Sequence, residues 1–352
     1  MVSPGGAPGP FTREGFEENA LAPPRAMPQI HSRSALERLS DREKRADLRA
    51  RNAWHANPPF MLTDEHNRLV DALNSHVNTN RDMAGQRLGF WVDAESSTGK
   101  TTSVMEWAHG FYRDRVQELV DETGSDLWNG NVYVPFACMT LSERPTPRTI
   151  NQDLSHFFPG PPATRSLTSA EYAINAIRLM EKCGTEVLLI DDAHSLANRW
   201  GNTDATSLHL KYLMSRSKVT LVLVSADDRK RARLMEEGVE TVDYDGQLKH
   251  RFVPYKMNRF QKGTPQWRKA VASIAVRMAL SEFDRDAFVA RRDLLFDLSG
   301  GFLGSIWLIV RLAAERAIRT GIEDLTEPLL LQVHRDWSAT ERYTPPLGGR
   351  AV

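Results

Sequence analysis

Cysteine is scarce in this chain of 352 residues, which contains only Cys138 and Cys183. The two cysteines stand far apart and no CxxC spacing occurs, so the sequence supports neither a disulfide framework nor a zinc site. Both lie near apolar stretches, which favours buried and unreactive thiols. We therefore expect a reduced, cytoplasmic environment.

The sequence also lacks long hydrophobic runs and an excess of charge of one sign. No apolar run approaches the about 18 residues that a membrane span needs, and the N-terminus lacks the cationic and apolar pattern of a signal peptide. These absences predict no membrane association. The 45 Lys and Arg residues balance 45 Asp and Glu residues. Any binding to nucleic acid must therefore come from local clusters.

What is present is an alternation of apolar strands with helical segments. Continuous apolar runs at 88–92, 187–190 and 219–224 alternate with helical patterns, and the region from 131 to 137 is rich in β-forming residues. Strands alternating with helices predict an α/β fold whose parallel sheet is covered by helices on both faces. The expected layout is a flexible and then basic extension (1–50), an α/β nucleotide-binding domain (51–255), a small helical lid domain (256–336) and a tail (337–352).

The stretch from Ala94 to Thr102 follows a short apolar strand and opens a helix, which is the arrangement expected of a GxxxxGK[ST] phosphate loop. In such a loop, backbone N–H groups surround the phosphates, the lysine reaches the outer ones and the next hydroxyl binds magnesium. Alanine at the first glycine position is expected to cause modest strain, because that glycine often adopts a conformation unfavourable for a side chain. The predicted ligands of ATP are Ser96, Ser97, Thr98, Gly99, Lys100, Thr101 and Thr102, with Thr101 also a ligand of Mg²⁺.

A second acidic motif comes about 90 residues later, where an apolar run ends in Asp191-Asp192. Asp191 is expected to hold Mg²⁺, and Asp192 to orient or deprotonate the attacking water. Glutamate is more usual at the second position, and aspartate is one methylene shorter. Misplacement of water by about 1 Å costs roughly 10²-fold in rate, so we predict slow ATP hydrolysis.

Two further residues are candidates for the catalytic apparatus. Ser225 ends a buried strand and is a candidate sensor of the γ-phosphate, with Asp227 as second choice. Arg251 precedes the helical region and is the candidate arginine finger for a neighbouring subunit, ahead of Lys249 and Arg259. The alternatives are a strand-terminating serine and a surface arginine.

A basic cluster lies between 246 and 270, with seven Lys or Arg residues and no acid, and a second one lies at 229–233. Such clusters bind the nucleic acid backbone by releasing counterions. Aromatic residues interleave with the first cluster, and these either stack on bases or belong to the core. A solvated subunit interface explains the charges equally well.

These residues and their order resemble the AAA+ ATPases of transposition systems, the TniB/TnsC type, and more distantly the phage Mu ATPase MuB. The phosphate loop and the acidic motif (the Walker A and B motifs) are common to all AAA+ proteins. The order of the segments in the C-terminal half is more typical of this family. The segments that carry the resemblance are 58–60, 99–102, 188–194, 247–252, 257–260, 298–309 and 313–318.

The resemblance implies an ATP-dependent oligomer, a ring or helical filament on double-stranded DNA, that selects target sites and recruits or activates a transposase, together with a target-selection protein. It implies that Lys100, Thr101, Asp191 and Asp192 act on the nucleotide and its magnesium ion. It also implies that Arg251 is the arginine finger that reaches a neighbouring subunit. One alternative is a nucleotide-gated scaffold in a defence or signalling assembly without DNA. Another is an origin-recognition or helicase-loader ATPase, which is less favoured because few residues follow Trp337 for a further DNA-binding domain.

Overall fold

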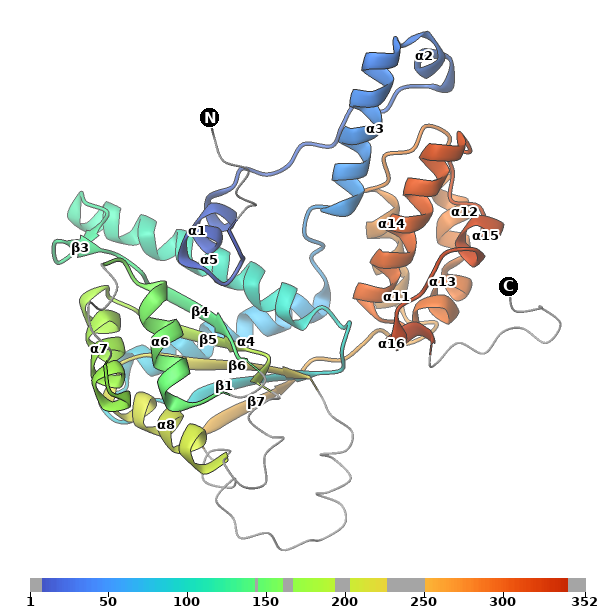
Figure 1. Ribbon diagram of the computed structural model, residues 1–352. Coiled ribbons are helices and arrows are strands. Elements are labelled where there is room, and N and C mark those ends of the chain that lie inside the picture. Colours follow the sequence, from blue (N-terminus) through green and yellow to red (C-terminus); the bar gives the residue numbers. More distant parts are fainter. Residues whose placement is uncertain (1–7, 143–144, 161–166, 194–202, 227–250, 341–352) are drawn as a thin grey trace, which may run out of the picture. The chain divides into compact units, whose positions relative to one another are not determined.

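Figure 1 shows the computed structural model, which describes residues 8–142, 145–160, 167–193, 203–226 and 251–340. The chain divides into two compact units, each made of segments distant in sequence. The first comprises 1–22, 68–95 and 100–257, and the second comprises 23–67, 96–99 and 258–352. Residues 51–67, expected in the nucleotide-binding domain, thus belong to the second unit.

A five-stranded, fully parallel sheet in the order β4-β5-β6-β1-β7 forms the centre of the first unit. Its central strands are almost wholly buried, as continuous apolar runs require of a sheet covered on both faces. The strands are β1 (Gly89–Ala94), β4 (Phe136–Thr140), β5 (Val187–Asp191), β6 (Thr220–Ala226) and β7 (Phe252–Lys256).

Two regions of the chain form strands that differ from the sequence expectation. The β-rich region at 131–137 is split into a short antiparallel hairpin, β2 (Leu127–Trp128) with β3 (Asn131–Val132), and the buried β4. Pro135, which has no N–H to donate, lies between them, and its carbonyl accepts hydrogen bonds from two residues at the start of β5. Strand β7 falls inside the basic cluster and was not predicted. It tolerates Pro254 because it is an edge strand.

Helices cover this sheet, as the sequence predicted, and their apolar faces join one core with the strands. Helices α6, α7 and α8 pack on one another, whereas α5 packs against β1 and β4. The helices of this unit are α1 (Arg13–Leu21), α4 (Asp64–Asp82, from Arg68 onward), α5 (Lys100–Thr123), α6 (Pro147–Phe157), α7 (Ser169–Lys182) and α8 (Thr203–Arg216).

Helix α1 lies in the stretch expected to be a flexible tail. It is capped by Thr12, whose side chain accepts from the N–H of Gly15, and it packs against α5. Phe16 is 1% exposed, and its ring stacks on that of Phe136 with the centroids 5.1 Å apart. A single well-placed aromatic residue therefore orders part of a Pro- and Gly-rich segment.

The described part of the second unit is all helical, as predicted for the C-terminal region, but it also contains α3 from the N-terminal part of the chain. The buried side chain of Arg51 on α3 forms ion pairs of 2.7 Å with Asp47 and with Glu323. The helices are α2 (Arg33–Arg38), α3 (Asp41–Ala56), α11 (Pro265–Ala275), α12 (Arg285–Ala290), α13 (Arg292–Ser299), α14 (Leu303–Thr320), α15 (Glu327–Leu331) and α16 (Trp337–Thr340). The basic part of the N-terminal extension thus ends in a helix, α3, which packs against α14.

Both cysteines are free and buried, as predicted, and burial raises the pKa of each thiol. No single helix among the described residues is long and apolar enough to cross a membrane. Only α13 and α14 taken together pass that test, and they are bent by 111° relative to one another.

Candidate nucleotide-binding site

The predicted phosphate loop joins the end of β1 to the start of α5. Ala94 is the last residue of β1, fully buried and paired with Ala226 of β6. Its backbone is not left-handed. The positive φ angles of this segment belong to Ser97 (63°) and Gly99 (92°). The strain expected at Ala94 is therefore absent, because a strand-terminal position accommodates a methyl group.

Lys100 and Thr101 form the first turn of α5, at the carboxyl edge of the sheet. The hydroxyl of Thr101 donates to Oδ1 of Asp191 at 3.3 Å. Burial lowers the pKa of Lys100, and the charges of Asp191, Asp192 and Asp93 oppose this effect. The structure thus brings a lysine, a hydroxyl and carboxylates together, as the sequence predicted.

Asp191 is 5% exposed, and burial raises the pKa of its carboxyl. One Thr hydroxyl and one or two carboxylates, completed by phosphate oxygens and water, are the ligands that Mg²⁺ uses in nucleotide sites. Within the described part of the chain no three His, Cys, Asp or Glu residues form a metal cluster. The donors therefore fit a magnesium ion that arrives with a nucleotide rather than one held by protein alone.

Asp192 follows β5 with a left-handed backbone (φ 55°), which aspartate tolerates better than most residues. Its N–H donates to Oδ1 of Asp191 at 2.9 Å, and its Oδ2 accepts from the hydroxyl of Thr140 at 3.3 Å. The side chain is exposed. The turn therefore directs one carboxylate into the buried site and leaves the next at its border.

Ser225 occupies a row of polar side chains across β6, β1 and β7, in register with Asp93 and, through it, with Lys256. Its hydroxyl donates to Oδ1 of Asp93 at 2.8 Å and accepts from the indole N–H of Trp91 at 2.8 Å. The single proton of this hydroxyl is thus already directed at a carboxylate. The alternative sensor, Asp227, lies outside the described residues.

Sequence reasoning did not assign Asp93 or Trp91 to this site, and it placed Lys256 only in the basic cluster. Asp93 contributes to the electrostatic environment of Lys100, and its backbone carbonyl accepts from the N–H of Met257. Its position, directly before Ala94, was the available signal.

Arg251 lies at the amino edge of the sheet, at the opposite end of the strands from Lys100. Its carbonyl accepts from the N–H of Gly89 at 2.8 Å, and its guanidinium donates to the hydroxyl of Ser215 at 3.2 Å. The six residues of β1 separate the two edges by about 20 Å. Arg251 therefore cannot serve the nucleotide site of its own subunit. Lys249 lies outside the described residues.

The remaining predicted loop residues, 96–99, belong to the second unit. There the N–H of Gly304 donates to the carbonyl of Ser97 at 2.8 Å. Asp336 accepts from the hydroxyls of Ser97 and Ser305. Thr98 is buried, whereas Ser96 and, in the first unit, Thr102 are exposed.

The sheet order, the loop after β1, the carboxylate that ends β5 and the presence of a helical unit define a P-loop fold of the AAA+ type. The fold is similar to that of the Aeropyrum pernix ORC1 protein in complex with DNA (TM-score 0.54, 15% identity, 79% of this chain and 67% of that one). It is also similar to the Aeropyrum pernix ORC2 protein in its ADPNP and ADP complexes (TM-score 0.53, 13% identity, 82% and 71%). At these identities the likeness is one of fold.

The family model for bacterial TniB proteins matches residues 51–262, and the chain therefore belongs to the TniB family. The family resemblance drawn from the sequence is thereby confirmed. No curated protein matches the chain in sequence.

Proposed function

We propose that this chain is an ATP-dependent, DNA-binding regulator of transposition. It oligomerises on target DNA and recruits or activates a transposase, with slow ATP hydrolysis as its switch. Membership of the TniB family carries the proposal. In this proposal Lys100 contacts the phosphates of ATP, and Thr101 and Asp191 hold the Mg²⁺ ion that accompanies them.

The position of Arg251 supports assembly into an oligomer. A guanidinium at the amino edge reaches a γ-phosphate only if that phosphate belongs to another subunit. Arg251→Ala should therefore retain ATP binding, because Lys100 and Asp191 are untouched, but lose ATP-dependent assembly and hydrolysis. Sedimentation with a non-hydrolysable ATP analogue measures the loss of assembly. Full assembly of the variant would contradict the finger role.

The DNA-binding part of the proposal depends on fewer residues than the basic cluster suggested. Arg259 donates to the carbonyl of Gly300, and Lys262 and Lys269 form ion pairs with Asp297 and Asp64. Phe252 and Trp267 are buried and cannot stack on bases.

Arg268 is exposed and forms no ion pair among the described residues, so it is the best-placed cation for a phosphate contact. Arg268→Ala is expected to weaken binding to duplex DNA and to reduce the salt slope by about 1. Arg285→Ala, at an exposed arginine on α12, is the matched control. Equal salt slopes for the two variants would show that Arg268 makes no contact with a DNA phosphate.

Slow hydrolysis follows from the short side chain of Asp192, which is held by Thr140 at the border of the site. Asp192→Glu is expected to raise the ATPase rate, because the longer carboxylate reaches further toward the attacking water, and Asp192→Asn to abolish hydrolysis while retaining binding. A wild-type rate above about 10 s⁻¹, an ordinary enzyme turnover, would contradict the argument.

Electron microscopy with an ATP analogue and plasmid DNA tests the proposal as a whole. Rings or filaments on the duplex are the expected result. Assemblies that form equally well without DNA, combined with no salt-sensitive DNA binding, would instead favour the nucleotide-gated scaffold.

A further inference from the structure

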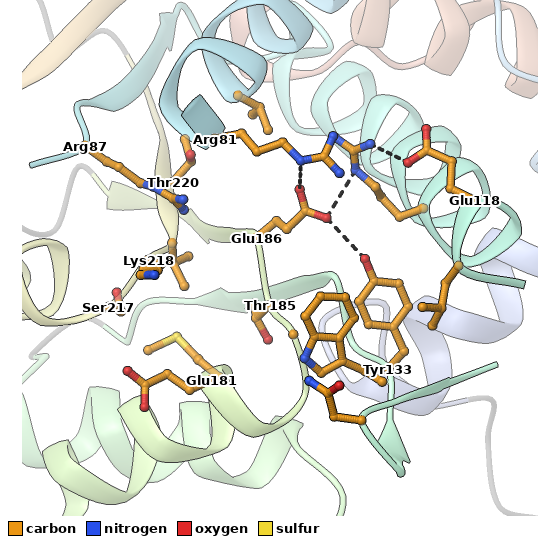
Figure 2. A pocket seen from close by; sticks show the side chains of 18 of the residues that line it. Arg81, Arg87, Glu118, Tyr133, Glu181, Thr185, Glu186, Ser217, Lys218 and Thr220 are labelled. Atoms are coloured by element: carbon orange, nitrogen blue, oxygen red, sulfur yellow. Dashed lines mark hydrogen bonds and ion pairs between the residues drawn. The ribbon is translucent and has the colours of Figure 1, made fainter. Parts of the chain in front are cut away.

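A cavity of about 490 Å³ opens at the amino edge of the sheet in the first unit, at the opposite edge from Lys100 and Asp191. It is lined by residues that precede or begin β1, β4, β5 and β6, by the hairpin β2–β3, and by parts of α4, α5 and α7 (Figure 2). Its volume falls within the range of about 300–1,000 Å³ typical of small-molecule sites. The proposed nucleotide chemistry uses none of its residues.

One side of the cavity is a closed ion-pair network around Glu186. Its Oε1 accepts from the hydroxyl of Tyr133 at 3.1 Å and lies 3.2 Å from Nε of Arg115, and its Oε2 lies 3.9 Å from Nε of Arg81. Arg115 also pairs with Glu118 at 2.6 Å. Two arginines thus balance two glutamates, and Figure 2 shows these contacts as dashed lines.

The other side carries cations that form no ion pair with a described residue. Arg87 is half-buried and makes no hydrogen bond or ion pair within the described part of the chain. Burial lowers the pKa of its guanidinium, an effect that the charge of Glu186 opposes. Lys218, exposed at the rim, also has no direct partner among the described residues. Figure 2 shows both on the side of Thr220 and Ser217, away from Glu118.

Hydroxyl groups also line this cavity. Thr185 is 7% exposed, and its buried hydroxyl has no hydrogen-bond partner among the described residues. The oxygen of Thr220 accepts from the amide of Asn80 at 3.0 Å, which leaves its own proton available for donation. An unpaired hydroxyl in a buried position is unfavourable, and a ligand oxygen would relieve that penalty.

The rest of the wall is apolar and is kept in shape by a glycine. Trp128 stacks on Tyr133 with the ring centroids 5.4 Å apart, and a Cβ on Gly184 would lie only 2.7 Å from the indole. Leu119 and Met180 continue this surface. Two exposed acids of the lining, Glu122 and Glu181, disfavour polyanions such as nucleic acid.

We propose that this cavity binds an organic anion, with a single carboxylate or phosphate head at Arg87, Lys218 and Thr185 and an apolar body against Trp128 and Met180. The anionic head would accept hydrogen bonds from the charged groups of Arg87 and Lys218 and from the neutral hydroxyl of Thr185. These donors have no acceptor among the described residues. Two sources share this chemistry: a free small acid and the C-terminal carboxylate of a partner protein.

The test is calorimetric titration of the full chain with 3-phenylpropionate, beside the neutral 3-phenylpropanamide and inorganic phosphate. Saturable binding of the acid, at least about tenfold tighter than of the amide or of phosphate, is the expected result. A peptide ending in Phe with a free carboxylate, compared with its amidated form, distinguishes the sources. Failure of both the acid and the free-carboxylate peptide overturns the proposal, as does equal binding of acid and amide, or of acid and phosphate.

Arg87→Gln is expected to weaken binding of whichever anion binds by about tenfold or more, because it removes a charge-assisted hydrogen bond. Arg178→Gln, at an exposed arginine of α7 outside the cavity, is the matched control and should bind as the wild type does. Retained nucleotide binding checks that Arg87→Gln is folded. Lys218→Gln, at the exposed rim, provides an independent second variant with a smaller expected loss. Unchanged affinity in both variants refutes the assignment.

Discussion

Acidification is expected to release α3 from the helical unit by protonating His55. This side chain is 3% exposed, and its Nε2 accepts a hydrogen bond from the N–H of Ala279 at 3.0 Å. Burial, with a smaller contribution from the neighbouring cation of Arg51, lowers the pKa of His55 from 6.5 to about 4. A protonated ring would direct an N–H at the N–H of Ala279, so the contact requires the neutral form.

The size of the effect follows from the pKa difference of about 2.5 units, which at ~1.36 kcal/mol per unit corresponds to at most ~3.4 kcal/mol. The unfolded chain binds this proton near pH 6.5 and the folded chain only near pH 4. The free energy of unfolding is therefore fully retained above pH 6.5 and falls as the pH decreases toward 4. Residual solvent access makes this an upper limit.

Urea titrations of the full chain, followed by tryptophan fluorescence between pH 7.5 and 4.5, measure it. Trp54, next to His55 in α3, donates to the carbonyl of Arg277 at 2.7 Å and reports on the docking of this helix. In His55→Gln the amide oxygen can still accept from Ala279 and does not titrate. The wild type should lose up to about 3 kcal/mol more than this variant as the pH falls.

His156→Gln, at an exposed imidazole at the end of α6, is the control and should follow the wild type. The pKa values of His109 and His209 are also lowered to about 4 by burial, but both residues are present in every variant and cancel in the comparison. If the wild type and His55→Gln lose the same stability on acidification, the reasoning is refuted.

Two further predictions concern the second unit. Arg51→Ala leaves the buried carboxylate of Glu323 without its cation and should lower the free energy of unfolding by about 3–5 kcal/mol, whereas Lys262→Ala, at an exposed pair, should change it by less than about 1 kcal/mol. Equal melting temperatures of the two variants would contradict this. Gly301→Ala should be strongly destabilising, because its φ is 78° and the new Cβ would lie 2.5 Å from the carbonyl oxygen of Phe260. Thermal unfolding measures the loss, and a wild-type midpoint would show that the turn can move.

The phosphate loop and the acidic end of β5 could be read from the sequence because each is a contiguous segment. Gly99-Lys100-Thr101 supplies a turn, a cation and a hydroxyl in successive positions, and the apolar run before Asp191 marks a buried strand by itself. The buried parallel strands were predictable for the same reason. Their continuous apolar pattern leaves few alternatives to a sheet covered on both faces.

Other elements had no such local signal. Strand β7 contains Pro254 and exposes most of its side chains, so neither alternation nor an apolar run marks it. Helix α1 depends on Phe16 fitting a site formed by α5 and β4. Propensity alone does not order a segment so rich in Pro and Gly, because its burial depends on a partner far along the chain.

The sequence alone therefore predicted the class of protein: a parallel α/β core, with Lys100, Thr101 and Asp191 as its candidate nucleotide ligands, followed by a helical unit. Contacts between distant residues were decided only in the folded chain. The sheet order places Arg251 at the edge away from the candidate nucleotide site and directs the proton of Ser225 to Asp93. It also leaves Arg87 beside a cavity, without an ion-pair partner among the described residues. The physical reason is the separation along the chain of the residues that interact. Loop and strand signals depend on neighbours in the chain, whereas the environment of a side chain depends on which strands lie beside it.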